Sequence, residues 1–321
     1  MKCIGVICGG FSSEFEISLK SAATIVANFP DAFVPVKIII KKGSYKAEWK
    51  GEAYDIDLKM KGFQVGSEWI ELDSYLIYTH GNPGENGKLQ AIFDMYEIPY
   101  VNSGALASEL SFDKWFCNQF LQGFGIKVAS SQLLLKGDSF NSTDLVNRLG
   151  LPLFVKPCDS GSSYGISRVN VEEKLTEAVD VAFKEGDSVV IESFLNGTEV
   201  TCGVYRNADG IHALPLAEIV SENEFFDFEA KYLGKSQEIV PARISDEATL
   251  KVQEVAKRVY GILRLRSIAR IDFMLVDGEP FVIEVNTTPG FTEESLVPRM
   301  LKHQEKSLKD FWTEIITYEL K

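Results

Sequence analysis

The chain has 321 residues, of which 45% are hydrophobic and 25% charged, a composition typical of a globular protein with two or three domains. Its formal net charge of −13 argues against nucleic acid or an anionic membrane as a partner. No stretch approaches the length of about eighteen apolar residues that a membrane span needs. The five cysteines are scattered without a CxxC pair, which favours free thiols in a reducing cytoplasm.

The first hundred residues alternate strand and helix signals, which predicts a βαβ arrangement around a small parallel sheet. Functional loops gather at the carboxyl ends of such strands, where Gly9-Gly10 and His80-Gly81 lie. The expected strands cover residues 3–8, 34–40, 69–72, 76–78 and 100–101, and the expected helices cover 17–28 and 89–96.

From residue 106 onwards the pattern is typical of α+β domains. The segment 221–241 shows neither helical nor strand periodicity, and its length predicts a lid or binding loop. The expected helices cover residues 106–124, 172–183 and 246–260, together with a final helix, and the expected strands cover 153–156, 167–170, 189–193 and 199–204.

The most informative stretch is Arg270-Ile271-Asp272-Phe273, which is followed by a second alternating run that ends in Glu284-Val285-Asn286. Between them, Asp277-Gly278 is a hairpin signal. A two-residue turn there would put Asp272 and Glu284 on opposite faces of the sheet. A three-residue loop ending in Gly278 would put the polar residues of both runs on one face. Asp272 and Glu284 would then be diagonal neighbours roughly 7–8 Å apart at their backbones, so that their carboxylates could share a metal-sized space.

Two carboxylates and an amide oxygen form a hard ligand set of the kind that magnesium prefers, usually completed by substrate phosphates. The alternative is a solvated hairpin face on which Arg270 only pairs with Asp272. The specialised loop Asn286-Thr287-Thr288-Pro289-Gly290-Phe291 favours the metal site.

Two further segments fit nucleotide binding. A strand ending at Lys156-Pro157 leads into Cys158-Asp159-Ser160-Gly161-Ser162-Ser163-Tyr164-Gly165, whose amide and hydroxyl donors suit phosphate oxygens, although a plain hairpin tip is the alternative. The loop is neither a Walker A motif nor GxGxxG. The apolar run 189–195 is interrupted only by Glu192. It is either an edge strand with one outward acid or a hinge whose backbone meets an adenine ring.

Together these motifs resemble the ATP-grasp ligases, and among them the D-alanine–D-alanine ligases. The matches run in family order from residue 9 to residue 298 and cover nearly the whole chain. They are Gly9-Gly10-Phe11-Ser12-Ser13-Glu14-Phe15-Glu16-Ile17-Ser18, His80-Gly81, Gly84-Glu85-Asn86-Gly87, Ser103-Gly104, Asp113-Lys114, Lys156-Pro157, Gly161-Ser162-Ser163, Gly165, Glu229-Ala230-Lys231-Tyr232, Arg270-Ile271-Asp272, Glu284-Val285-Asn286-Thr287-Thr288-Pro289-Gly290 and Ser295-Leu296-Val297-Pro298.

The resemblance implies an ATP-grasp fold: an N-terminal parallel α/β domain (1–105), a central α+β domain (106–207) and a C-terminal α+β catalytic domain (208–321) with a lid at 221–241. It implies a cytoplasmic homodimer that joins two D-alanines for peptidoglycan precursors. The carboxylate of one D-alanine would attack the γ-phosphate of ATP, and the amine of the second would displace phosphate. The alternatives are the same mechanism with D-lactate or D-serine, or an ATP-binding module without catalysis.

The resemblance also implies a role for each matching residue. The catalytic residues would be Glu14, which holds the first ammonium, Ser162, Tyr232 and Arg270. The substrate-binding residues would be His80, Gly290, Ser295 and Leu296, the last three for the second carboxylate. ATP would be held by Lys114, Lys156, Ser163, Glu192, Phe194, Leu195, Glu199 and Lys231. One or two Mg²⁺ (or Mn²⁺) ions would bind Asp272, Glu284 and Asn286.

Taken singly, several of these residues have plainer interpretations. Glu14 would cap the helix beginning near Ile17, because acids favour helix N-termini. His80 would be a solvated turn residue, Lys114 a surface lysine and Tyr232 a core aromatic. Their joint order favours the functional roles.

The chain departs from the family pattern at Asn86, where aspartate is usual, at Tyr164, which replaces a small residue, and at Glu293-Glu294. The extra acidic pair leaves the affinity for the second substrate open. Within the resemblance, Tyr232 favours D-alanine over D-lactate as that substrate.

Overall fold

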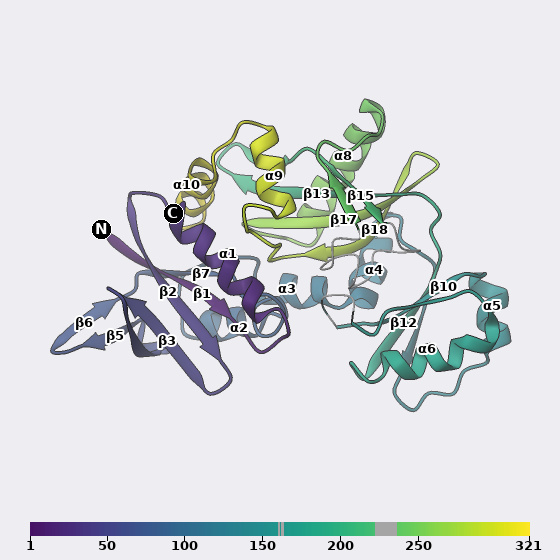
Figure 1. Ribbon diagram of the computed structural model, residues 1–321, viewed down its shortest axis with the longest axis horizontal. Coiled ribbons are helices and arrows are strands. Elements are labelled where there is room, and N and C mark those ends of the chain that lie inside the picture. Colours follow the sequence, from purple (N-terminus) through teal and green to yellow (C-terminus); the bar gives the residue numbers. More distant parts are fainter. Residues whose placement is uncertain (160, 162–163, 222–235) are drawn as a thin grey trace.

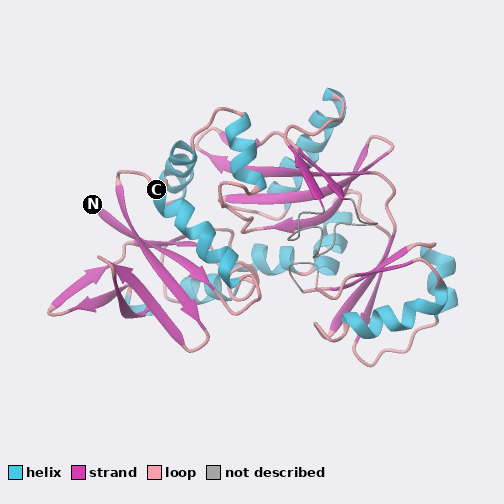
Figure 2. Cartoon of the chain, in the orientation of Figure 1, coloured by secondary structure: helices cyan, strands magenta, loops and turns pink. Residues whose placement is uncertain are grey.

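The computed structural model describes residues 1–159, 161, 164–221 and 236–321. Over these ranges the chain forms three sheets, one after another along the sequence, with helices packed around them (Figures 1 and 2). No helix in the described part is long and apolar enough to cross a membrane. The mixture of α/β and α+β units agrees with the expected fold class.

The first sheet has eight strands in the order β6-β5-β4-β3-β2-β1-β7-β8. Its β1, β2, β7 and β8 pair in parallel as expected, and the core of β1 is a continuous apolar run, as is usual for a strand covered on both faces. The expectation of a small parallel sheet is incomplete, because β3 to β6 add an antiparallel extension. The elements are β1 (Lys2–Gly9), α1 (Phe15–Ala27), β2 (Phe33–Lys41), β3 (Ser44–Trp49), β4 (Glu52–Asp57), β5 (Gly62–Val65), β6 (Glu68–Glu71), β7 (Ser74–Ile77), α2 (Lys88–Met95) and β8 (Tyr100–Val101).

The single helix expected over 106–124 is two helices, α3 (Ala105–Phe112) and α4 (Lys114–Gln122). The break falls at Asp113, which has extended backbone angles and accepts a hydrogen bond from the Phe116 backbone N–H at 2.8 Å. An aspartate in this position caps the helix that follows it. As a result, Lys114 is the first residue of α4.

The second sheet has four strands in the order β11-β10-β12-β9 and a core of its own. Strand β12, which carries Glu192, lies between β10 and β9, so the edge-strand interpretation of this segment is wrong. The elements are β9 (Ser131–Leu135), α5 (Ser142–Leu149), β10 (Leu153–Pro157), β11 (Ser167–Val169), α6 (Leu175–Ala182) and β12 (Ser188–Ser193).

The third sheet has six strands, five in the order β16-β15-β13-β17-β18, with β14 paired to β13. The elements are β13 (Thr198–Asn207), β14 (Gly210–Ala213), β15 (Ala217–Ser221), β16 (Ser236–Ile239), α8 (Asp246–Ile262), β17 (Ile268–Val276), β18 (Glu279–Asn286), α9 (Leu296–His303) and α10 (Leu308–Glu319).

Three expectations need correction in this part of the chain. Strand β13, placed before a boundary at residue 207, is hydrogen-bonded within the C-terminal sheet. Residues of α4 such as Cys117 and Leu121 share that sheet's core, so 106–130 also packs with it. The segment 221–241 is not without strands, since Ser236–Ile239 pairs with β15, while 222–235 lies outside the described residues.

The turn between β17 and β18 differs from the one expected. It is the two-residue Asp277-Gly278, in which φ is positive at both residues (50° and 77°), as a type I′ hairpin turn requires. Such a turn alone would leave Asp272 and Glu284 on opposite faces. The three-residue loop is therefore wrong.

A β-bulge between Asp272 and Phe273 restores the shared face. It shifts the register by one residue, so Asp272 lies directly opposite Glu284, and Arg270 lies opposite Asn286. The two carboxylates are consequently direct cross-strand neighbours, closer than the expected diagonal pair.

The first and third sheets share one hydrophobic core. Helix α1 packs beside α10, and the core joins Ile25 and Tyr78 to Phe291, Phe311 and Trp312 (Figure 1). The second sheet does not contribute to this cluster. Burial of apolar surface stabilises the folded chain by roughly 25 cal/mol per Å². The shared core therefore holds the first sheet against the third.

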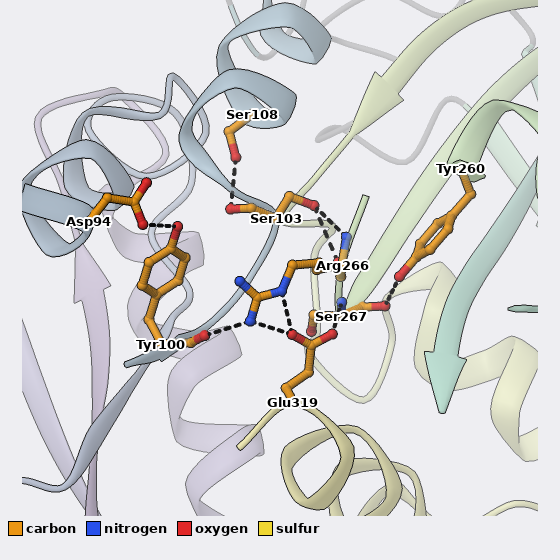
Figure 3. A network of polar contacts seen from close by, with 8 residues as sticks. All are labelled: Asp94, Tyr100, Ser103, Ser108, Tyr260, Arg266, Ser267 and Glu319. Carbon is orange, nitrogen blue, oxygen red and sulfur yellow. Dashed lines mark hydrogen bonds and ion pairs between the residues drawn. The ribbon is translucent and has the colours of Figure 1, made fainter. Parts of the chain in front are cut away.

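A polar clamp adds to that shared core (Figure 3). The Arg266 guanidinium donates to the Tyr100 backbone carbonyl at 3.0 Å and to the Glu319 carboxylate at 2.6 Å. Glu319 also accepts from the Ser267 backbone N–H at 3.1 Å, and the Ser103 hydroxyl accepts from the Arg266 backbone N–H at 3.1 Å. The clamp ties the end of the first sheet to the start of β17 and to the end of α10.

We predict that Glu319→Gln lowers the free energy of unfolding by about 2 kcal/mol, because hydrogen bonds to a charged group contribute roughly 1.5–3 kcal/mol. Urea denaturation measures this change. Asp31→Asn, which removes the exposed pair with Lys309, serves as the control and should cost less than about 0.5 kcal/mol. Equal losses in the two variants would contradict the clamp.

Candidate active site

The face shared by β17 and β18 carries a compact ion cluster. Arg270 donates to both oxygens of Asp272 at 2.8 Å, and Asn286 donates to Asp272 Oδ2 at 3.1 Å. Thr201 on the neighbouring strand β13 donates to Asp272 Oδ1 at 2.5 Å. The alternative interpretation of the hairpin expected Asp272 to pair with Arg270 on a solvated face. The pair is present, but it belongs to a half-buried network.

The second carboxylate of the pair is neutralised from another element. Lys114 Nζ lies 3.1 Å from Glu284 Oε1, and only 8% of the lysine side chain is exposed. The Lys114 backbone N–H also donates to the Cys158 carbonyl at 2.9 Å, at the entry to the Ser/Gly loop. Lys114 is therefore not a surface lysine, and it connects the hairpin to the segment expected to bind phosphate.

A second buried ion pair lies in the four-stranded sheet. Lys156 Nζ is 2.7 Å from Glu192 Oε2, and Asn118 of α4 donates to Glu192 Oε1 at 3.1 Å. Nearby, the Phe194 ring packs against Phe154 at 6.2 Å between centroids. These groups supply one cation and an apolar ring beside the carboxyl end of β12.

The remaining nucleotide candidates lie close by. Leu195 is half-buried in the connection between β12 and β13. Glu199 is two residues from Thr201 on β13, and alternate strand residues share a face, so it points to the side of the sheet that holds Asp272.

Glu14 faces the Ser/Gly loop from the first sheet. It is the N-cap residue of α1, but its side chain makes no capping hydrogen bond. Its Oε2 lies 2.8 Å from where a Cβ on Gly161 would be and 3.5 Å from where one on Gly81 would be. Glycine at these positions therefore lets three loops converge around one carboxylate.

His80 is buried rather than solvated. Its Nε2 lies 3.1 Å from the Ser21 hydroxyl, which also accepts a hydrogen bond from the Phe291 backbone N–H at 3.1 Å. Burial lowers the pKa of His80, although the charge of Glu14 opposes that shift. A neutral imidazole at this position holds the loop that follows β7 in place.

Glu85 joins loops from two sheets. Its carboxylate accepts from the Gly81 backbone N–H at 2.7 Å and from the Thr288 backbone N–H at 3.2 Å. Burial raises the pKa of Glu85 to about 8, and the negative charge of Glu14 adds to the rise, while the two backbone N–H donors lower it.

The loop after β18 leads to the start of α9. Ser295 is the N-cap of α9, yet its hydroxyl accepts from the Thr292 backbone N–H at 3.0 Å instead of capping the helix. A Cβ on Gly290 would lie 3.2 Å from that hydroxyl. Leu296 is buried, whereas Glu293 and Glu294 are exposed. The first turn of α9 thus has backbone N–H groups without a side-chain cap, an arrangement that suits an anion.

Contacts link several of the described candidates across the sheets: Lys114 joins Glu284 to the Cys158 carbonyl, and the Glu14 carboxylate lies near Gly161. Ser162, Ser163, Lys231 and Tyr232 lie outside the described residues. Sequence reasoning gave no role to Thr201, Asn118 or Glu85. The family motif contains Glu85, but Thr201 and Asn118 carry no local signal.

The donor set fits magnesium. Asp272 and Glu284 lie opposite each other with Asn286 beside them, and the described residues contain no group of three or more His, Cys, Asp or Glu that would form a complete metal cage. Two carboxylates completed by phosphate oxygens are typical of magnesium sites that bind together with a nucleotide.

Comparison with known proteins agrees with this geometry. The D-ala D-ala ligase N-terminus family model matches residues 3–103, and the D-ala D-ala ligase C-terminus model matches residues 120–317. The chain belongs to the D-alanine–D-alanine ligase family. Curated family members include the D-alanine–D-alanine ligase of Flavobacterium johnsoniae, 44% identical over the whole of both chains, and that of Parabacteroides distasonis, 43% identical over 100% of this chain and 98% of the relative.

Solved structures of family members have the same fold. The VanG D-Ala:D-Ser ligase from Enterococcus faecalis aligns with a TM-score of 0.89 at 32% identity over 99% of both chains. The D-alanine–D-alanine ligase from Bacillus anthracis complexed with ATP aligns with a TM-score of 0.82 at 28% identity, over 100% of this chain and 98% of the other.

The raised pKa of Glu85 predicts a pH dependence of stability. Between pH 4.5 and about 8 the unfolded chain loses the Glu85 proton while the folded chain keeps it, so stability falls as pH rises. Glu85→Gln removes this titration, and the variant should gain up to about 1.4 kcal/mol per pH unit relative to the wild type. Urea denaturation from pH 6 to 8 measures the difference, and a constant difference would contradict the prediction.

Proposed function

We propose that this chain is a cytoplasmic, Mg²⁺- and ATP-dependent ligase that joins two D-alanines for peptidoglycan precursors. The observation that carries the proposal is Arg270 in direct contact with Asp272, beside Glu284 and Asn286. Binding of a nucleotide alone does not need an arginine among the metal ligands. A transferring phosphoryl group does, because its charge must be neutralised in the transition state. The names of the family members support the choice of substrate.

The first D-alanine would bind between the sheets. Glu14 would accept hydrogen bonds from its ammonium near Gly81 and Gly161, with neutral His80 holding the adjacent loop. The D-alanine carboxylate would then face the hairpin and attack the γ-phosphorus of ATP. This phosphorylation supplies the leaving group that a carboxylate lacks.

ATP would lie between the second and third sheets. Lys114 and Lys156 would bind its phosphates and Phe194 would pack near the adenine, with Glu192 and Glu199 at the adenine and ribose. Asp272, Glu284 and Asn286 would hold Mg²⁺, or Mn²⁺, which supplies positive charge to the phosphate oxygens when bound. The ATP complex of the Bacillus anthracis family member supports nucleotide binding.

The second D-alanine would bind at the start of α9. Its carboxylate would bind beside Gly290 and Ser295 and accept from the N–H groups of the first turn, that of Leu296 among them. The amine would attack the acyl phosphate and expel phosphate, and Arg270 would stabilise the oxyanion that forms.

We expect Mg·ATP and D-alanine to give ADP, phosphate and D-alanyl-D-alanine, identified by product mass, and EDTA to abolish the reaction. Arg270→Ala should remove turnover while ATP affinity stays within a few-fold. Arg258→Ala, an exposed arginine on α8, is the control and should keep full rate.

The outcomes separate the alternatives. D-lactate or D-serine in the dominant product would keep the mechanism and change the second substrate. ATP binding without D-alanine-dependent ADP release would contradict catalysis.

We also propose that the enzyme is a homodimer. Met95 of α2 and Leu106 of α3 are 81% and 76% exposed on helices that pack together, and exposed apolar side chains on neighbouring helices are candidates for an interface. Light scattering should give twice the chain mass of 35.8 kDa, and Leu106→Glu should give the monomer mass. A monomeric wild type would contradict the proposal.

A further inference from the structure

An ion pair connects strand β16 to helix α9. The Arg299 guanidinium donates through Nη1 to Glu238 Oε2 at 2.8 Å and through Nη2 to the Glu238 backbone carbonyl at 2.6 Å. One side chain thus holds both the carboxylate and the main chain of its partner. Both residues are about one-third exposed, 31% for Arg299 and 29% for Glu238.

Arg299 lies one helical turn after Ser295. Its backbone N–H donates to the Ser295 carbonyl at 3.2 Å, so the guanidinium extends from the first full turn of α9. Next to it in the chain, Pro298 has no N–H, and the Ser295 hydroxyl is engaged by Thr292. Arg299 thus adds a polar contact near the start of α9 to the apolar packing of Leu296, Val297, Met300 and Leu301.

Two arginines act electrostatically on Glu238. Burial raises its pKa, while the charges of Arg299 and Arg270 lower it. The strand order β16-β15-β13-β17 places Glu238 and Arg270 in the same sheet. The contact between Arg299 and Glu238 therefore joins the start of α9 to the sheet that carries Arg270.

We propose that the Arg299–Glu238 pair is a positioning pair for the second amino-acid substrate. It holds the first turn of α9, where the carboxylate of that substrate would bind, at a fixed distance from Arg270, where its amine would react. The inference rests on the proposed function. It assigns neither residue a contact with substrate, since both act through the placement of the helix.

The test is the dependence of the initial rate on D-alanine concentration, fitted with separate half-saturation constants for the first and second D-alanine, together with KM for ATP. Arg299→Met removes both hydrogen bonds to Glu238 and replaces arginine with an unbranched side chain of similar length. We expect the second half-saturation constant to rise about tenfold and kcat to fall, because misplacement by 1 Å costs up to about 10² in rate. The constant for the first D-alanine and KM for ATP should stay within about twofold, since Glu14 and Lys156 are held by other contacts.

Two conservative variants keep the test valid if Arg299→Met folds poorly. Arg299→Lys retains the charge but has no planar fork for two acceptors, so it should have an intermediate effect. Glu238→Gln keeps the backbone carbonyl and loses the charge, and it should also be intermediate. The double variant Arg299→Met/Glu238→Gln should be no worse than Arg299→Met alone, because the two residues act through one contact.

Arg243→Met is the matched control. Arg243, in the segment between β16 and α8, makes a bidentate pair with Glu218 on β15 of the same sheet, at 2.9 and 2.8 Å, without contributing to the Arg299–Glu238 contact. The control should lower thermal stability as much as Arg299→Met does, yet leave the second half-saturation constant unchanged.

The inference is overturned if Arg299→Met and Arg299→Lys keep the wild-type second half-saturation constant, or if Arg243→Met raises it equally. It is also overturned if all three constants rise together, because that pattern indicates a general loss of structure. Dipeptide synthesis by the wild type is measured before any variant. A wild type that makes no dipeptide would overturn the proposed function itself.

Discussion

The carboxylate of Asp272 organises the reactive face of the C-terminal sheet. It accepts hydrogen bonds from Arg270 on its own strand, Asn286 on one neighbouring strand and Thr201 on the other. A charge held in this way needs its partners within hydrogen-bond distance, because an unsatisfied half-buried carboxylate is costly. The β-bulge after Asp272 is the backbone feature that makes the arrangement possible. The bulge interrupts the regular hydrogen-bond ladder between β17 and β18 and places Glu284 directly opposite Asp272.

The packing of the sheets explains how the two substrate sides meet. The first and third sheets share a core through Phe291 and Trp312 and are joined again at Arg266 and Glu319 (Figure 3). The loops that carry Glu14 and His80 are thereby held in a constant relation to Arg270. The second sheet has a separate core, and its described ties to the third include the contacts of Lys114 and Asn118 on α4. The described ties on the nucleotide side of the site thus include polar contacts, whereas the amino-acid side is joined to the third sheet by an apolar core.

The local sequence pattern predicted the helices and strands whose structure depends on residues near each other in the chain. The apolar run of β1, the amphipathic α1 and the alternation in β17 and β18 were visible in this way. The break at Asp113 was also accessible, because aspartate before a helical run is a capping signal, but the apolar pattern on both sides obscured it. Strands β3 to β5 were missed because short polar strands in a meander have little apolar periodicity.

Long-range pairing could not be predicted from local pattern. The bulge after Asp272 depends on the register between two strands, and no local residue preference announced it. Thr201 and Asn118 acquire their roles only because β13 lies beside β17 and α4 lies beside β12, which is a matter of strand order. The family resemblance named Lys114 and Glu14 as candidates, but their surroundings came only from the fold.

The charges of the site explain how a protein with a net charge of −13 can accept a nucleotide. Lys114 is paired with Glu284, Lys156 with Glu192, and Arg270 with Asp272, so each of these cations is balanced by a carboxylate. Such pairs hold long side chains in place without a large net electrostatic field. Because their charges are balanced, they attract an incoming polyphosphate only weakly. A cation that turns to a phosphate oxygen leaves its carboxylate unpaired. At Asp272 and Glu284 the carboxylates released are the ligands that a divalent cation needs. Binding of nucleotide and of metal would therefore each favour the other, and the acidic surroundings would select the metal complex over the free polyphosphate.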